Sequence, residues 1–111
     1  MQKYDAFAIV DEVYEHIVYK PTEYTYFSNL PGMYERTISC GSLSKTYSIT
    51  GWRIGYLFAP PHLAAALRQL HMFMTISAPS PLQEAAVTSL GFDRSYYEGC
   101  GKYIRRSATS S

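Results

Sequence analysis

The stretch Ser42-Leu43-Ser44-Lys45-Thr46-Tyr47-Ser48-Ile49-Thr50-Gly51-Trp52-Arg53 places one lysine among small hydroxyl residues and an arginine eight positions later. Upstream of it, the apolar run Ala6-Phe7-Ala8-Ile9-Val10 leads directly into Asp11. A short, continuous apolar run is typical of a strand that is buried on both faces of a parallel sheet. Asp11 would then stand at the carboxyl end of that strand, the edge at which open α/β sheets bind ligands.

Two further strands are expected at residues 37–40 and 54–58, which puts Lys45 in the connection after the second strand. Prolines, threonines and the pair Pro31-Gly32 in residues 15–33 predict turns and irregular loop. The pattern indicates the α/β class, with short sheet strands followed by helices.

Three helices are predicted in the second half of the chain. The first, over residues 62–74, rests on apolar residues at helical spacing: Leu63, Ala66, Leu67, Leu70 and Met74.

The second predicted helix runs over residues 80–90, from a capping box of Ser80 and Gln83, with a proline in the first turn, to Gly91. Asp93 can cap the third, which is expected to run through Arg106. Residues 107–111 offer nothing to pack and are expected to fray.

The overall composition excludes several classes of protein. With 111 residues, 47% hydrophobic and 17% charged, the chain is about one small domain and can form a core. A net charge of +1 gives no field for nucleic acid or a membrane surface, and no apolar run reaches membrane-spanning length. The histidines and cysteines lack the spacing of a metal site. Cys40 and Cys100 do not indicate a disulfide framework, and residues 1–5 do not resemble a signal peptide, so a cytoplasmic setting is expected.

Two features of the sequence concern surface that this chain alone cannot bury. Three strands with three helices make a thin sheet whose edges and faces stay unpaired, which predicts part of a larger domain. The chain also carries 11 tyrosines. Tyrosine often lies where one surface meets another, although half-buried packing within the chain is the explanation we favour.

The residues around Lys45 are suited to holding a phosphorylated aromatic aldehyde. An uncharged lysine amine attacks an aldehyde, and burial or nearby positive charge favours the uncharged form. Arg53 could supply that charge or grip a phosphate, and the hydroxyls of Ser42 and Ser44 could bind the same phosphate. Asp11 could pair with a ring nitrogen, and Tyr14 could lie beside a ring oxygen.

These residues resemble the class I/II aminotransferases, which are pyridoxal-phosphate enzymes of the aspartate-aminotransferase fold type. The likeness covers nearly the whole chain and is carried by Asp11-Glu12-Val13-Tyr14-Glu15-His16, Ser42-Leu43-Ser44-Lys45-Thr46, Gly51-Trp52-Arg53-Ile54-Gly55-Tyr56 and Pro81-Leu82-Gln83-Glu84-Ala85-Ala86. The resemblance implies that residues 1–111 are a central fragment of the large, cofactor-binding domain of a longer chain, inactive alone. It also implies a homodimeric parent that moves an amino group from an amino acid to a 2-oxo acid.

The same resemblance implies a role for each residue of the expected site. Lys45 would bind pyridoxal 5'-phosphate as a Schiff base and then carry the proton between substrate and cofactor. Asp11 would bind the pyridine nitrogen and Tyr14 the ring oxygen. Ser42 and Arg53 would bind the phosphate. Ser44 stands where relatives often have glycine or alanine, so its role in the cofactor site is the least defined.

Two other interpretations stay open. One is a pyridoxal-phosphate lyase or ring-forming synthase of the same fold, which would share the residues matched by Lys45 and Asp11. The other is a non-catalytic piece that binds a partner through a tyrosine-rich surface. The amino-acid substrate cannot be predicted, because specificity in this family rests largely on segments outside this sequence.

Overall fold

A three-stranded sheet forms the centre of the molecule. The computed structural model describes residues 2–109, with side chains at 3–100 and at 102. The strands are β1 (Ala8–Asp11), β2 (Thr37–Ser42) and β3 (Gly55–Phe58), in the order β1-β2-β3. β1 is parallel to β2, and β3 is antiparallel to β2. The predicted α/β class is confirmed, and all three expected strands are present.

The register brings three chain segments to one edge of the sheet. Asp11 pairs with Cys40, so the carboxyl ends of the parallel strands β1 and β2 lie side by side. Ser42 pairs with Gly55, so the antiparallel β3 begins where β2 ends. The turn after Asp11, the segment after Ser42 and the segment before Gly55 therefore leave the sheet together.

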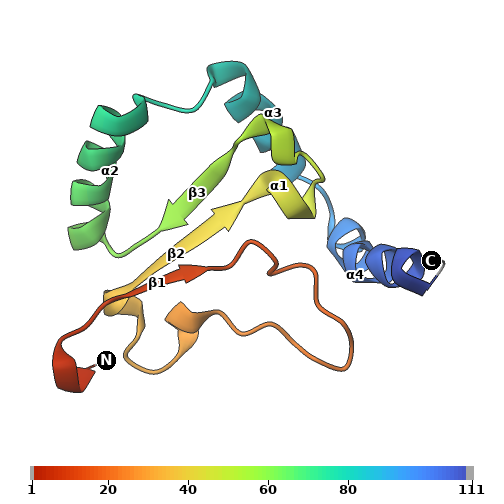
Figure 1. Ribbon diagram of the computed structural model, residues 1–111, viewed down its shortest axis with the longest axis horizontal. Coiled ribbons are helices and arrows are strands. Elements are labelled where there is room, and N and C mark those ends of the chain that lie inside the picture. The colour runs from red at the N-terminus through yellow and green to blue at the C-terminus, as the bar shows by residue number, and fades with distance from the viewer. Residues whose placement is uncertain (1, 110–111) are drawn as a thin grey trace.

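The described residues form four α-helices. α1 (Leu43–Thr46) lies between β2 and β3, whereas α2 (Pro61–Thr75), α3 (Ser80–Leu90) and α4 (Arg94–Thr109) follow β3. Short 3-10 turns occupy Gln2–Tyr4, Phe27–Asn29, Tyr34–Arg36 and Thr50–Trp52. Figure 1 shows α2 beside one end of β3, with α4 on the opposite side of the molecule from α2. No α-helix among residues 2–109 is both long and apolar enough to cross a membrane.

The prediction that β1 is buried on both faces is wrong. Residues on this strand alternate between half-buried and exposed, and the side chain of Ile9 is 75% exposed. Only β2 pairs with β1, so β1 is an edge strand in this structure. Within the part of the chain that the structure describes, the face of β1 that carries Ile9 is open.

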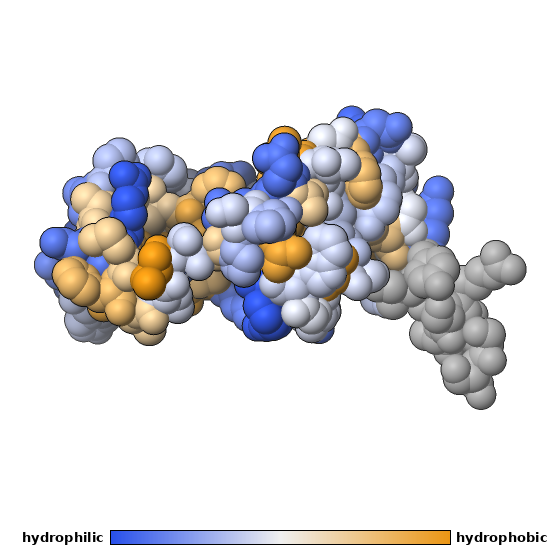
Figure 2. Space-filling view, turned by 90° about the horizontal axis from the view of Figure 1, so that it is seen from above, coloured by the Kyte–Doolittle hydropathy of each residue, from blue (hydrophilic) through white to orange (hydrophobic). Residues whose placement is uncertain are grey.

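The core is smaller than the composition suggested. Among the side chains that the structure describes, Leu43 and Ile54 are the buried hydrophobic ones. α2 buries none of its residues; within its apolar stripe Leu70 is 58% exposed and Met74 72%. Figure 2, seen from the side of α2 and α3, shows hydrophobic side chains reaching the surface in several places. The radius of gyration is 16.2 Å, whereas a compact domain of this length would have about 13 Å.

The observed helix boundaries agree with the predicted ones better than the observed caps agree with the predicted caps. α3 ends at Leu90 as predicted, but Pro79 occupies the N-cap position and no side chain caps the helix. The predicted capping box is therefore wrong: Ser80 is already helical, and the Gln83 side chain donates to the carbonyl of Ala78 at 2.7 Å.

The predicted cap of the last helix is confirmed, because the Asp93 carboxylate accepts a hydrogen bond from the Ser95 amide at 2.7 Å. Hydrogen bonding to Ser95, first to its side chain and then to its amide, lowers the pKa of Asp93. The fraying expected at residues 107–111 stays a prediction. α4 continues to Thr109, and residues 110 and 111 lie outside the described part of the chain.

Candidate functional site

The short helix α1 leaves Lys45 exposed and buries its other side chains. Its other three residues, Leu43, Ser44 and Thr46, are buried, whereas Lys45 is exposed. A single helical turn loses much backbone entropy and gains few hydrogen bonds, so it is unstable alone. α1 therefore depends on contacts with the rest of the chain to stay helical. The buried side chains anchor the helix, and the lysine is the residue it presents outward.

Ser42 holds the beginning of α1. Its hydroxyl oxygen accepts a hydrogen bond from the Ser44 amide at 3.1 Å, as an N-cap residue does. The same oxygen lies 2.7 Å from the Ser44 hydroxyl and 3.1 Å from the Ile54 carbonyl. Each hydroxyl has a single hydrogen to donate. A phosphate bound by Ser42 or Ser44 would therefore have to share or replace one of these contacts.

Arg53 is brought to the same corner through the backbone. The Leu43 amide donates to the Ile54 carbonyl at 3.2 Å, which ties the start of α1 to the residue after Arg53. Arg53 has a positive φ of 54°, and its Nη1 donates to the Thr50 carbonyl at 3.0 Å. The side chain is exposed, and no described carboxylate forms an ion pair with it. Most of its five donors are free for an anion.

Asp11 and Tyr14 lie on the turn that leaves β1. One carboxylate oxygen of Asp11 accepts a hydrogen bond from the Val13 amide at 3.2 Å, and the side chain is exposed. Tyr14 is 55% exposed. The Nζ of Lys45 lies 5.8 Å from the centroid of the Tyr14 ring, within the range of a cation–π contact.

The structure thus joins the predicted site residues in pairs rather than in one cluster. Lys45 contacts Tyr14, Ser42 contacts Ser44, and Arg53 reaches this corner through Ile54. Within the described residues no hydrogen bond or ion pair links Lys45 directly to Asp11 or Arg53. The side chain of Lys45 is exposed.

An open cavity of about 450 Å³ adjoins the lysine. Lys45 and Thr46 of α1 form one wall, and Tyr96 and Cys100 of α4 form another. Ile17, from the loop after β1, also contributes to the lining. The lysine therefore borders a hollow between α1 and α4.

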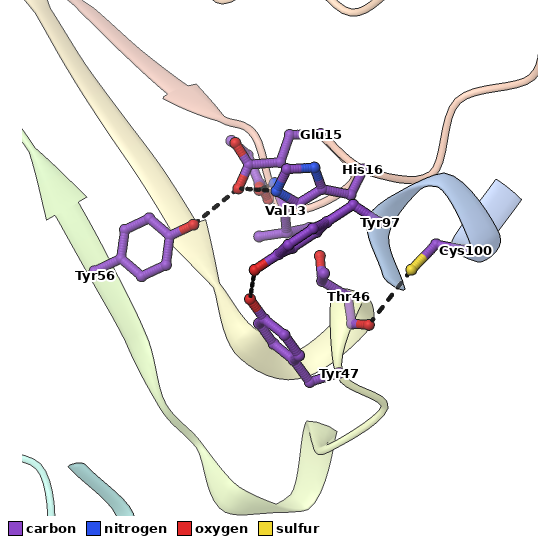
Figure 3. Close-up of polar contacts among 9 residues, drawn as sticks. Val13, Glu15, His16, Thr46, Tyr47, Tyr56, Tyr97 and Cys100 are labelled. Atoms are coloured by element: carbon purple, nitrogen blue, oxygen red, sulfur yellow. Dashed lines mark hydrogen bonds and ion pairs between the residues drawn. The ribbon is translucent and has the colours of Figure 1, made fainter. Parts of the chain in front are cut away.

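A second group of polar contacts, which the sequence did not reveal, lies behind this site (Figure 3). The Tyr47 and Tyr97 hydroxyls are 2.7 Å apart, and the Tyr97 ring packs against His16 with centroids 4.6 Å apart. The Tyr56 hydroxyl donates to the Glu15 carboxylate at 2.8 Å. These contacts connect α4, the segment after α1, β3 and the loop after β1.

The pKa values of three phenols in and beside this group are raised, so Tyr47, Tyr56 and Tyr96 stay protonated at neutral pH. Burial, followed by the hydrogen bond to Glu15, raises the pKa of Tyr56. Burial and the bond to Tyr97 likewise raise the pKa of Tyr47, and burial raises the pKa of Tyr96. The excess of tyrosines was the one sequence signal for this group. The packing interpretation is confirmed for Tyr47, Tyr56, Tyr96 and Tyr97, which are half-buried.

Comparison with known proteins defines the class of the fold and site. The family model described as aminotransferase class I and II matches residues 1–109. The chain belongs to this family.

Proteins with similar sequences include aminotransferases from plants and from Dictyostelium. A bifunctional aspartate aminotransferase and glutamate/aspartate-prephenate aminotransferase of Petunia hybrida is 46% identical over 83 residues, which is 75% of this chain and 17% of that protein. A kynurenine–oxoglutarate transaminase of Dictyostelium discoideum is 44% identical over 74% of this chain and 19% of its own length. The chain thus spans about a fifth of the length of these relatives.

Solved structures agree with the sequence comparison. The fold superposes on an N-succinyldiaminopimelate aminotransferase of Mycobacterium tuberculosis with a TM-score of 0.87, at 29% identity over 94% of this chain and 27% of that one. An Escherichia coli protein with a methionine aminotransferase function gives a TM-score of 0.85, at 33% identity over 93% of this chain and 27% of that one. The chain therefore has the fold of a fragment of the large domain of these enzymes.

Proposed function

We propose that the protein to which this chain contributes is a pyridoxal-phosphate-dependent aminotransferase that moves an amino group from an amino acid to a 2-oxo acid, and that Lys45 is its reactive amine. The observation that carries the proposal is the arrangement of α1. Three of its residues are buried, and the exposed one is a lysine at the sheet edge where β1 and β2 end. Membership of the aminotransferase family supports the reaction class.

The donor set at this edge fits pyridoxal 5'-phosphate. The cofactor carries an aldehyde, a ring nitrogen, a ring oxygen and a phosphate. The chain offers an amine at Lys45, a carboxylate at Asp11, a phenol at Tyr14 and a guanidinium at Arg53. None of the three charged groups is neutralised by an ion pair within the described residues. Unpaired charges of both signs at one edge suit a ligand that itself carries both signs.

Each residue then has a physical task. When bound, pyridoxal phosphate supplies an electron-withdrawing ring that stabilises negative charge on the substrate carbon. Asp11 would keep the ring nitrogen protonated, and Tyr14 would orient the ring oxygen. Arg53 and the hydroxyls of Ser42 and Ser44 would hold the phosphate. The Nζ of Lys45 would bind the aldehyde and afterwards accept and return the substrate proton.

Substrate profiling of the protein loaded with pyridoxal phosphate tests the reaction. An aminotransferase forms a new amino acid only when both an amino donor and a 2-oxo acid acceptor are supplied, and the Lys45→Ala variant should lose this activity. Release of ammonia and pyruvate without an acceptor would instead indicate a lyase of the same fold and contradict the proposal.

Two wider features belong to the same proposal. The family resemblance supports a homodimer, which sedimentation of the protein would detect. A reducing, cytoplasmic setting fits the two cysteines, both free thiols in this structure; fractionation of the source cells would test it.

A further inference from the structure

We propose that Tyr96 and Tyr97 of α4 are positioning residues that hold the lysine-bearing helix α1 in place, with Tyr96 acting through the Thr46 carbonyl and Tyr97 through the Tyr47 hydroxyl. We call these two tyrosines the α4 clasp. The inference rests on the proposed function in one respect, the role of Lys45 as the reactive amine. It concerns two residues that lie 50 positions along the chain from their partners Thr46 and Tyr47, in a part of the chain that sequence reasoning did not assign to the site.

The need for a clasp follows from the length of α1. The last carbonyl groups of any helix lack amide donors within the helix, and in a helix this short that applies to all of them. The Leu43 carbonyl accepts from the Tyr47 amide at 3.2 Å, and the Lys45 carbonyl from the Ser48 amide at 3.3 Å. The Ser44 carbonyl accepts from the Thr50 hydroxyl at 3.0 Å.

The Thr46 carbonyl is satisfied from outside this segment. The Tyr96 hydroxyl donates to it at 2.8 Å, and the Cys100 thiol lies 3.8 Å from it. A thiol is a weak donor, so Tyr96 supplies the stronger bond. Because burial raises the pKa of Tyr96, its phenol keeps the hydrogen that it donates.

Tyr97 makes the second contact of the clasp. Its hydroxyl is 2.7 Å from that of Tyr47, the residue that caps α1 (Figure 3). The ring of Tyr96 is stacked on the Tyr47 ring, with centroids 5.6 Å apart. On its other side Tyr97 packs against His16, in the segment that follows Tyr14. The clasp therefore fixes α1 relative to the turn that carries Asp11 and Tyr14.

Precise placement of α1 matters because the backbone position of Lys45 is set by a single helical turn. An amine attacks a carbonyl carbon fastest when the backbone of the residue that carries it is held in one position. Releasing the Thr46 carbonyl should leave the fold intact but broaden the positions of the Lys45 Nζ. The rate of covalent capture at saturating aldehyde should then fall, while the affinity of the initial encounter should not.

The test compares Tyr96→Phe and Tyr97→Phe, which remove single hydroxyls, with Tyr4→Phe, a matched control at a ring that is 76% exposed. Pyridoxal phosphate is the probe, and the adduct at Lys45 is fixed with borohydride and quantified by mass spectrometry. The dependence on probe concentration separates the half-saturating concentration from the maximal rate. We expect Tyr96→Phe to lower the maximal rate about fivefold, the effect of one neutral hydrogen bond, with the half-saturating concentration unchanged.

Amide hydrogen exchange of the peptide that contains residues 43–48 provides a readout without cofactor. Exchange should be about fivefold faster in Tyr96→Phe than in Tyr4→Phe. Unchanged exchange and an unchanged maximal rate would overturn the inference. If Lys45 is not captured even in the unsubstituted protein, the proposed function fails, and the exchange measurement alone decides whether α4 holds α1. A parallel rise in the half-saturating concentration and in exchange throughout the chain would show general destabilisation and also contradict the clasp.

Discussion

Arg53 shows most clearly how a single residue is prepared for a ligand. Its φ of 54° lies in the left-handed region, which residues other than glycine and asparagine adopt only at an energetic cost. The residue is nevertheless an arginine that no described carboxylate pairs with. Strained backbone at an exposed, unpaired charge is a feature of functional sites.

Replacing Arg53 with Asn should weaken the binding of pyridoxal phosphate specifically at its phosphate. Asparagine tolerates the left-handed conformation, so the variant removes the charge with little backbone change. We expect the half-saturating concentration of pyridoxal phosphate to rise about tenfold. Pyridoxal, which lacks the phosphate, is the matched probe and should bind the variant and the unsubstituted protein equally. An equal loss for both probes would show that Arg53 does not contact the phosphate.

Individual residues of the site were predictable from sequence, but their surroundings were not. Asp11 does end β1, and the residues around Lys45 do follow β2, because local pattern fixes where a strand stops. The exposure of Lys45 depends on what covers α1, which no local pattern reports. The same holds for Glu12, which is 5% exposed and accepts the Phe27 amide from 15 residues away.

At the scale of elements, the packing of β2 against β3 depends on a glycine. Gly41 pairs with Tyr56, whose ring lies over the glycine. A Cβ at position 41 would clash with the Cε2, Cζ and hydroxyl oxygen of Tyr56. The absence of a side chain on Gly41 therefore allows Tyr56 to reach Glu15 with its hydroxyl.

Gly41→Ala should destabilise the protein by about 1–3 kcal/mol, because the Tyr56 ring has to move. In a Tyr56→Ala background the same substitution should cost much less, since the obstructing ring is gone. Chemical denaturation of the four proteins of this double-mutant cycle measures the coupling. Equal costs of Gly41→Ala in the two backgrounds would mean that the ring does not occupy the space above the glycine.

The residue ranges of the strands and helices were predicted better than the capping interactions at the helix ends. The strand and helix ranges follow from apolar periodicity and from proline and glycine, which act within a few residues. The range predicted for α3 is correct, but its predicted capping box is wrong because two prolines flank Ser80. Pro79 took the N-cap position, and Gln83 bonded backward to Ala78 instead of completing a capping box. The clasp between α4 and α1 joins residues 50 apart, a separation that periodicity cannot resolve.

Across the whole molecule, the apolar residues form more exposed surface than core. Composition predicted a core, and the count of hydrophobic residues was sufficient for one. In the structure, however, Leu43 is 2% exposed while Phe73 of α2 is 80% exposed. Hydrophobic content alone does not say whether the faces of a sheet and its helices have partners within the same chain.

Leu43→Ala and Leu70→Ala form a matched pair that measures this difference. Leu43 is 2% exposed and Leu70 is 58% exposed, so the same atoms are removed from a buried and from an open position. We expect Leu43→Ala to lower the free energy of unfolding of the 111-residue chain by about 2–5 kcal/mol. Leu70→Ala should change it by about 0.5 kcal/mol or less. Equal losses would show that α2 packs against a core in solution.

The central claim is that α1 presents one particular amine to a cofactor aldehyde, and mapping that amine tests it most directly. The protein is incubated with pyridoxal phosphate, reduced with borohydride and analysed by peptide mass spectrometry. The exposed lysines Lys3, Lys20 and Lys102 serve as internal references. The account predicts an adduct concentrated at Lys45 and absent from Lys45→Ala. Modification spread evenly over the four lysines would contradict it.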